Sequence, residues 1–346
     1  MPSTEPLLPA PRAETDAETD AETDAETGAE TGASRARWDE LLCGIAGLLP
    51  AGASSVLVGG HGPAPAVLAA RLAARVPAAT VRCSVGVRRR SDENRADEDW
   101  DAVIWVRAAP AGPGDSRGDD EAGAGIVVDM YDLDWPVIRR VAEPLAGRGQ
   151  WYLTETRAFF AVRAASWDTK FGDDLPAYAT AVAQAGIPLG GTVADVGCGT
   201  GRALPALRRA VGPDGTVIAI DVTPEMLREA RAAGRAADAA LLLADARRLP
   251  LADTSADAVF AAGLVNHLPD TEAGLRELAR VTRPGGLLVL FHPSGRAALA
   301  ARHGRTLSPD EPLAAVPLRR LTRAAGWDLT SYDDAADRFF ALAVRD

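Results

Sequence analysis

Residues 193–201, with the sequence VADVGCGTG, limit the fold of this chain more than any other segment. The apolar beginning predicts a short buried strand, and the end carries glycine at every second position. Glycine adopts backbone angles that side chains forbid, so the chain can turn sharply and expose bare main chain to a ligand. The helix predicted to begin at Arg202 offers unpaired N–H groups to the same ligand. This segment therefore predicts an α/β domain with a ligand site at the turn.

Strands and helices alternate from residue 192 onward. We predict strands at residues 192–196, 216–220, 240–244, 257–262, 286–291, 327–332 and 338–344. The intervening helices are expected at residues 202–211, 224–234, 271–282 and about 314–325. Such alternation forms a parallel sheet with helices on both faces, and the last two strands are close enough to form a hairpin. The predicted fold is a Rossmann-like, doubly wound, mostly parallel seven-stranded sheet.

An acid closes the second of these strands. Asp221 can accept hydrogen bonds from both hydroxyls of a ribose. Thr223 and Pro224 suit the cap and the first position of the next helix, which would hold Asp221 in register. The glycine turn and Asp221 both lie at carboxyl ends of strands, where open α/β sheets bind ligands. A nucleoside site is therefore predicted.

Four motifs occupy the carboxyl ends of successive strands: the glycine turn, Asp221, the pair Asp245-Ala246, and the run AAG at 261–263. Followed by RPGG at 283–286, this succession resembles the class I S-adenosylmethionine-dependent methyltransferases, especially the small-molecule group that includes quinone C-methyltransferases. The resemblance covers about residues 165–346. It implies an enzyme that uses S-adenosyl-L-methionine to methylate a small molecule.

The resemblance also implies which residues hold the methionine and ribose parts of the cofactor. The loop around the methionine part is matched by Asp195, Gly197, Gly199 and Gly201, with Asp195 near the amino group. The acid that binds the ribose hydroxyls is matched by Asp221.

The adenine site is matched by a second set of residues. Val222 and Met226 correspond to its apolar lining, and Asp245 to the carboxylate that faces the adenine amino group. The backbone N–H of Ala246 would meet the ring. Backbone contacts to the methionine end would come from Ala261 and Ala262.

Methyl transfer from a sulfonium is an in-line displacement whose leaving group is already activated. Aligning the acceptor and excluding water contributes about 7–11 kcal/mol in favourable cases. A base is needed only where the acceptor loses a proton. His267, beyond the fourth strand, and His292, which ends the fifth, are the candidate bases, and no other catalytic residue is identified. The sequence contains no trio of metal ligands of the kind that metal-dependent methyltransferases use, so no metal is predicted.

The N-terminal part is predicted to contain a tail and a smaller domain. Residues 1–34 include a repeat of Ala-Glu-Thr-Asp or Ala-Glu-Thr-Gly, which has little to bury and predicts a disordered acidic tail. Residues 35–149 show an α/β pattern. The turn GGHGP at 59–63 has the place of a phosphate loop, but it contains no lysine and two nearby prolines lack N–H groups. We predict an accessory, degenerate nucleotide-binding-like domain there and the methyltransferase domain at 150–346.

Composition excludes several functional classes. Lysine and arginine total 37, yet Lys170 is the single lysine, which removes the P-loop and the Tyr-x-x-x-Lys reductase pair. The formal net charge is −11, of which residues 1–34 supply −8 (nine acids and one arginine), leaving −3 for the rest. A nearly neutral folded part argues against nucleic acid as a partner.

The cysteines and the apolar segments indicate the cellular compartment in which the chain is expected to fold. Three widely spaced cysteines predict a reduced, cytoplasmic protein. Residues 41–70 contain no charged residue, but three prolines and several glycines interrupt them, so no membrane span is predicted.

Two alternative functions remain open from the sequence. One is a catalytically inert protein that binds S-adenosylmethionine or serves as a scaffold, because acceptor residues are not recognisable. The other is an NAD-dependent oxidoreductase, although its G-x-G-x-x-G fingerprint fails at Arg202. The N-terminal domain is also a candidate for binding a protein partner.

Overall fold

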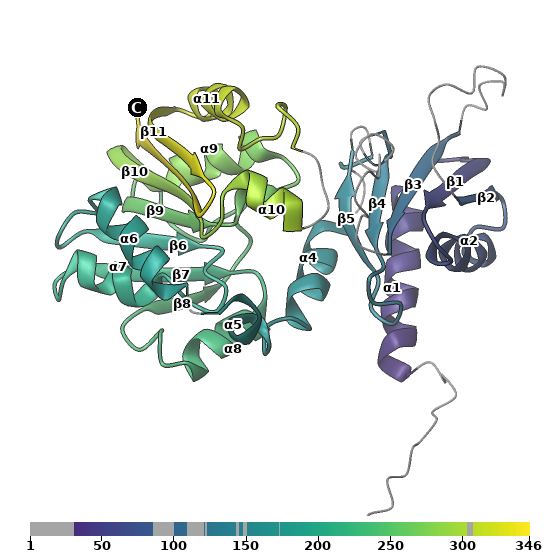
Figure 1. Ribbon diagram of the computed structural model, residues 1–346, viewed down its shortest axis with the longest axis horizontal. Helices are drawn as coiled ribbons and strands as arrows, with labels where there is room; N and C mark the ends of the chain where they lie inside the picture. Colours follow the sequence, from purple (N-terminus) through teal and green to yellow (C-terminus); the bar gives the residue numbers. More distant parts are fainter. Residues whose placement is uncertain are drawn as a thin grey trace, which may run out of the picture.

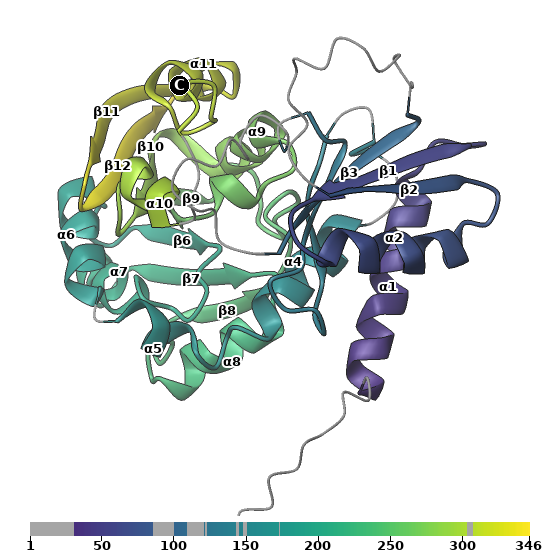
Figure 2. The same ribbon diagram turned by 45° about the vertical axis from the view of Figure 1, so that its right-hand side comes forward.

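The computed structural model describes residues 31–85, 100–108, 121, 123–142, 145–147, 151–172, 174–302 and 307–346. These residues form a five-stranded and a seven-stranded sheet, each with its own helices. The two halves lie side by side, with helix α4 (Trp151–Ala161) between them (Figures 1 and 2).

The N-terminal sheet has the strand order β2-β1-β3-β4-β5. Its strands are β1 (Ser55–Gly60), β2 (Thr80–Val85), β3 (Ala102–Arg107), β4 (Ile126–Asp129) and β5 (Val137–Val141). All neighbours are parallel except β4 and β5. Two helices, α1 (Gly32–Leu48) and α2 (Ala64–Arg75), pack their apolar residues against one face. The sequence analysis did not identify strands β2 and β5, because Arg82 in β2 and the adjacent Arg139 and Arg140 in β5 interrupt their apolar patterns.

The C-terminal sheet has the order β11-β12-β10-β9-β6-β7-β8 and confirms the predicted doubly wound fold. Its strands are β6 (Thr192–Val196), β7 (Thr216–Asp221), β8 (Ala240–Leu243), β9 (Ala256–Ala262), β10 (Thr282–His292), β11 (Trp327–Ala335) and β12 (Arg338–Arg345). Strand β12 pairs antiparallel with both β10 and β11, so the predicted hairpin is also present. The remaining pairs are parallel.

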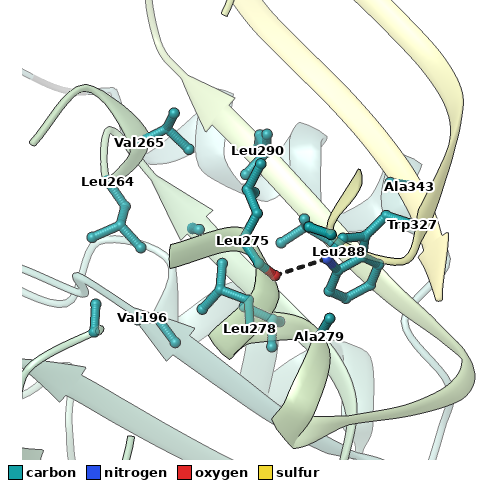
Figure 3. Close-up of a cluster of buried hydrophobic side chains, with 14 of the residues drawn as sticks. Val196, Leu264, Val265, Leu275, Leu278, Ala279, Leu288, Leu290, Trp327 and Ala343 are labelled. Carbon is teal, nitrogen blue, oxygen red and sulfur yellow. Dashed lines mark hydrogen bonds between the residues drawn. The ribbon is translucent and has the colours of Figure 1, made fainter. Parts of the chain in front are cut away.

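Helices cover both faces of this sheet because its strands alternate apolar side chains between the faces. Helices α6 (Leu175–Ala185) and α7 (Leu204–Val211) pack on the face that carries Phe260 of β9. Helices α9 (Thr271–Val281) and α11 (Ala315–Ala324) pack on the face that carries Val259. In that second core the indole of Trp327 is fully buried and donates a hydrogen bond to the Leu275 carbonyl (3.0 Å; Figure 3).

Four shorter helical elements complete the described C-terminal half. They are α5 (Trp167–Phe171), α8 (Pro224–Ala232), the 3-10 turn η1 (Val265–His267) and α10 (Arg296–Arg302). Helix α8 begins with the predicted proline, but Thr223 at its cap position makes no side-chain capping hydrogen bond. Asp270 does cap α9, by accepting from the Ala273 N–H (2.9 Å). Within the described ranges, no helix is both long enough and apolar enough to cross a membrane.

The acidic tail predicted for residues 1–34 must be shortened at its end. Residues 1–30 lie outside the described part of the chain, but α1 already begins at Gly32. The Thr31 side chain caps this helix by accepting from the Ser34 N–H (3.1 Å). The buried Ser34 hydroxyl donates to Asp134 (3.1 Å). These bonds fix residues 32–34 as the first turn of a helix.

The division predicted between residues 149 and 150 stays a prediction, and α4 directly after it contacts both halves. Trp151 and Tyr152 pack in the core of the N-terminal sheet. On the other side, the Arg157 Nε donates to the carbonyl of Val222, just beyond β7 (2.9 Å). Helix α4 therefore holds the two sheets at a defined separation.

Candidate functional site

A cavity of about 1020 Å³ lies between the two halves. One wall consists of the carboxyl ends of β6, β7, β8, β9 and β10, and the other of β3, β4, β5 and α4. Nine residues of the predicted cofactor site line it: Asp195, Gly197, Gly199, Asp221, Val222, Met226, Asp245, Ala246 and Ala262. The two candidate bases, His267 and His292, line it as well.

The glycine turn has one open position and one packed position. Gly199 has φ +53°, and a Cβ on it would meet no atom within 4 Å, so the main chain there is bare toward the cavity. Gly201 has φ +78°, and a Cβ on it would lie 2.8 Å from Leu204 Cδ1 and 3.1 Å from Ala230 Cβ. Gly201 does not line the cavity. Its missing side chain instead lets the turn pack closely against Ala230 of α8.

Asp221 is held rigidly at the end of β7. One carboxylate oxygen accepts from the Gly199 N–H (2.9 Å), and the other accepts from the Thr223 N–H (2.8 Å). The carboxylate is buried, and this burial raises its pKa. Each oxygen keeps a lone pair. Asp221 is therefore positioned to accept further hydrogen bonds from hydroxyl groups.

Asp195 is the most unusual group of the site. Its side chain is 1 % exposed, and its Oδ2 has no hydrogen-bond partner in the described residues. Burial, and then the charge of Asp221, raise the pKa of Asp195 to about 8. An unpaired buried carboxyl oxygen is costly unless a ligand donates to it. Asp195 therefore fits a cationic amino group, as the resemblance implied.

Asp245 already has a partner at the adenine end. Its carboxylate accepts from Arg247 Nε (2.9 Å) and Nη2 (2.7 Å), and that guanidinium lies 4.2 Å from the centre of the Tyr152 ring. Burial raises the pKa of Tyr152 to about 12. Tyr152 lines the cavity together with Val222 and Met226. The structure thus adds an aromatic ring to the predicted adenine site.

Ala261 and Ala262 differ in their placement. Ala262 lines the cavity, whereas Ala261 is buried in the core between the sheet and α9. The difference arises because successive residues of a strand point to opposite faces. Ala261 also pairs with Leu290 in the β9–β10 ladder.

His267 is half-buried at the cavity wall beside Arg139, whose Nη2 lies 3.3 Å from its Nδ1. Burial, with smaller contributions from Arg139 and His292, lowers the pKa of His267 to about 3. A guanidinium can only donate hydrogen bonds, so Nδ1 accepts and the ring proton is on Nε2. In this arrangement the Nε2–H of His267 is a hydrogen-bond donor at the cavity wall. The lone pair on Nδ1 is already occupied by Arg139, so His267 has no lone pair free to accept a proton.

His292 is the other predicted base. Its Nδ1 lies 3.1 Å from the backbone nitrogen and 2.9 Å from the carbonyl oxygen of Ser294. Burial lowers its pKa, so the ring is neutral near pH 7. Cys198, in the turn, has its pKa raised by burial, which keeps its thiol protonated and unsuited to nucleophilic attack.

An aromatic and cationic wall of the cavity was not found from the sequence. Phe159 lies between two guanidinium groups, with Arg139 at 3.6 Å and Arg163 at 3.9 Å from the ring centre. Phe160 lies 5.0 Å from the His267 ring and 5.7 Å from that of Trp167. No local pattern signals this wall, because β5, α4 and the loop after β9 meet only in the folded chain.

Aromatic residues between positions 150 and 190 lie at the cavity wall and against the core of the C-terminal sheet. Trp167 contacts Phe160 at the cavity wall. Tyr178 also lines the cavity, and it packs on Phe291 of the core (5.0 Å between ring centres). Among the residues that the structure describes, no three histidine, cysteine or acidic side chains are close enough to hold a metal ion.

Comparisons with known proteins locate the similarity in the C-terminal half. The family model described as a methyltransferase domain matches residues 194–290. An uncharacterised protein of Mycobacterium tuberculosis is 44% identical over 112 residues, which are 31% of this chain and 39% of that protein. The ubiquinone/menaquinone biosynthesis C-methyltransferase UbiE of Burkholderia mallei is 35% identical over 114 residues, 32% of this chain and 46% of that protein. The match therefore spans less than half of the length of either relative.

One solved structure is also similar to part of this chain. The crystal structure of a SAM dependent methyltransferase from Aquifex aeolicus is 25% identical, with a TM-score of 0.44. The similarity covers 52% of this chain and 98% of that one.

Proposed function

We propose that this chain, whose residues 194–290 match the model of a methyltransferase domain, is a class I S-adenosylmethionine-dependent methyltransferase that transfers a methyl group to a small-molecule acceptor. The acceptor would bind in the cavity between the two sheets. The observation that carries this proposal is the unpaired buried Oδ2 of Asp195, which lies in the same cavity as Asp221 and the bare main chain of Gly199.

These residues fit S-adenosyl-L-methionine. Asp195 would accept from the amino group, Asp221 from the ribose hydroxyls, and Tyr152 with Met226 would pack around the adenine. The bound cofactor supplies a methyl group on a sulfonium, which is an activated leaving group.

The chain itself has to align the acceptor and exclude water. Phe159, Phe160 and Trp167 place apolar rings at the cavity wall beside the loop after β9. Their rings would shield the reacting atoms from solvent, and alignment of this kind contributes about 7–11 kcal/mol in favourable cases.

Proton removal would not be the task of His267. Its Nδ1 lone pair is used by Arg139, so its Nε2–H would instead donate a hydrogen bond to an acceptor oxygen or nitrogen. His292 remains the candidate base, and an acceptor that is already deprotonated would need none.

Calorimetric titration with S-adenosyl-L-methionine, with NADH as a parallel titrant, tests the cofactor assignment. We expect binding of S-adenosyl-L-methionine alone. The Asp221→Ala variant should bind it more weakly by about 1.5–3 kcal/mol, the value of a hydrogen bond to a charged group. The matched control is Asp214→Ala, which changes an exposed acid outside the cavity.

The outcomes separate the candidate functions. Binding of NADH instead of S-adenosyl-L-methionine would support the alternative function, an NAD-dependent oxidoreductase. Cofactor affinity unchanged in a folded Asp221→Ala protein would contradict the ribose assignment. Production of S-adenosylhomocysteine with an acceptor distinguishes an enzyme from a protein that only binds or senses the cofactor.

A further inference from the structure

The face of the N-terminal sheet that borders the cavity carries aromatic and charged side chains. Strand β3 points Ile104 and Val106 into the core under α1 and α2, so Trp105 and Arg107 point the other way. In β4, Val128 points into that core, and its neighbour Asp129 lies next to Arg107 in the ladder. Trp105, Arg107, Asp129 and Arg139 of β5 all line the cavity.

Two arginines of this wall have no direct counter-ion. Among the described residues, no carboxylate lies within 4.0 Å of the guanidinium of Arg139 or of Arg163, although Arg107 pairs with Glu121. Asp129 attracts both cations from farther away, and Asp132 attracts Arg163 more weakly. Burial, together with Arg107 and Arg163, lowers the pKa of Arg139 to about 10. The arrangement carries positive charge that is only partly compensated.

These cations lie where a methyl acceptor has to bind. Arg139 donates to His267 in the turn after β9, and this turn is next to Ala262 and Gly263 at the cofactor end of the sheet. Phe159 lies between the two guanidinium groups, and Phe160 lies against His267. The cofactor residues Asp195 and Asp221 lie at the ends of β6 and β7 and are acidic.

We propose that the N-terminal sheet forms half of the acceptor site and that the acceptor is a planar compound with an anionic group, held by Arg139 and Arg163. This inference rests on the proposed function. The aromatic rings of Trp105, Phe160 and Trp167 provide flat apolar surfaces for the planar part. Guanidinium groups suit carboxylates because their donors match both oxygens.

Matched probes test the charge requirement on the full chain. Benzoate and 2-naphthoate are titrated beside benzamide and 2-naphthamide, which keep the shape but not the charge, with and without S-adenosylhomocysteine. We expect at least one acid to bind about tenfold or more tightly than its amide, because hydrogen bonds to charged groups have that effect.

Two arginine variants test the residues. Arg163→Gln and Arg139→Met, both at half-buried positions and the second close in volume to arginine, should each weaken binding of the acid about ten- to a hundredfold. Their affinity for S-adenosyl-L-methionine should stay within about twofold of the wild type. The matched control is Arg276→Gln, which removes an exposed cation paired with Glu272 far from the cavity wall.

Three results would overturn the inference. These are equal affinity for acid and amide, no binding of either acid, and arginine variants that lose S-adenosyl-L-methionine rather than the acid. If the wild type binds the acids with the expected preference but does not bind S-adenosyl-L-methionine, the proposed function fails while the anion site stands.

Discussion

At the scale of single residues, three acids at the ends of three strands have different environments. Asp221 accepts two backbone N–H groups, Asp245 pairs with Arg247, and Asp195 has an oxygen without a partner among the residues that the structure describes. A buried carboxyl without donors favours its protonated form. Of these three acids, Asp195 is the one whose protonation we expect to change most when a ligand donates a hydrogen bond to its free oxygen.

The raised pKa of Asp195 makes the stability of the ligand-free protein depend on pH. The folded-state pKa of about 8 lies above the ordinary value of 3.8, so folded Asp195 binds a proton between these values. Its contribution to stability is fully present below about pH 4 and is lost as the pH rises toward 8. The loss is at most about 1.4 kcal/mol per pH unit.

The variant Asp195→Asn should remove this dependence, because asparagine stays neutral. We expect its melting temperature, relative to the wild type, to rise between pH 5 and pH 8 in scanning calorimetry without ligand. Asp214→Asn, an exposed control, should show no such trend. A constant difference between Asp195→Asn and the wild type would mean that Asp195 is ionised throughout.

At the scale of elements, α4 determines how the two sheets face each other. It reaches the N-terminal half through Glu155, whose carboxylate accepts from Arg37 Nη2 of α1 (2.5 Å) and from the Ile138 N–H of β5 (2.6 Å). The side chains of Arg37 and Glu155 are only 1% and 2% exposed. One buried ion pair thus joins α1, α4 and β5.

Glu155→Ala should lower the free energy of unfolding by about 3–5 kcal/mol, because it leaves a buried guanidinium without its main partner. The matched control is Glu40→Ala, since Glu40 binds the same Arg37 from a half-exposed position. That pair contributes about 0–1 kcal/mol. Urea unfolding followed by circular dichroism measures both variants, and similar losses for both would contradict the role of Glu155.

At the scale of the whole molecule, the two sheets have separate hydrophobic cores. One core contains residues of α1, α2, β1 and β3, and the others contain residues of the C-terminal helices and strands. Halves with their own cores and a cavity between them are expected to unfold with partly independent stability. A ligand that binds one half should then protect that half selectively.

Hydrogen exchange of the full chain tests this independence. S-adenosyl-L-methionine at a hundred times its dissociation constant should stabilise its half by about 2.7 kcal/mol. We therefore expect slower exchange in β6 and β9 and unchanged exchange in β1 and β2. Equal protection of all four strands would show that the halves unfold as one unit.

The sequence by itself determined the C-terminal fold and placed the glycine turn and Asp221 at the carboxyl ends of strands. The glycine turn, Asp221, Thr223 and Pro224 act within a few residues of one another, and alternating strands and helices dictate a parallel sheet. Such local signals can be recognised in the sequence, because turn geometry and side-chain periodicity depend on neighbouring residues and need no distant partner. The sequence also identified Gly201 as part of the turn, although in the structure this glycine allows the turn to pack against Ala230.

Only the tertiary structure decided what the rest of the cavity contains. Arg139 and His267 are 128 residues apart in the chain, yet their contact sets the proton position on the histidine. Strand β5 escaped detection because Arg139 and Arg140 interrupt its apolar pattern, and those charges are tolerated because the strand borders a cavity. Residues that meet across two sheets carry no local pattern, so the cavity wall proposed to bind the acceptor is apparent only in the folded chain.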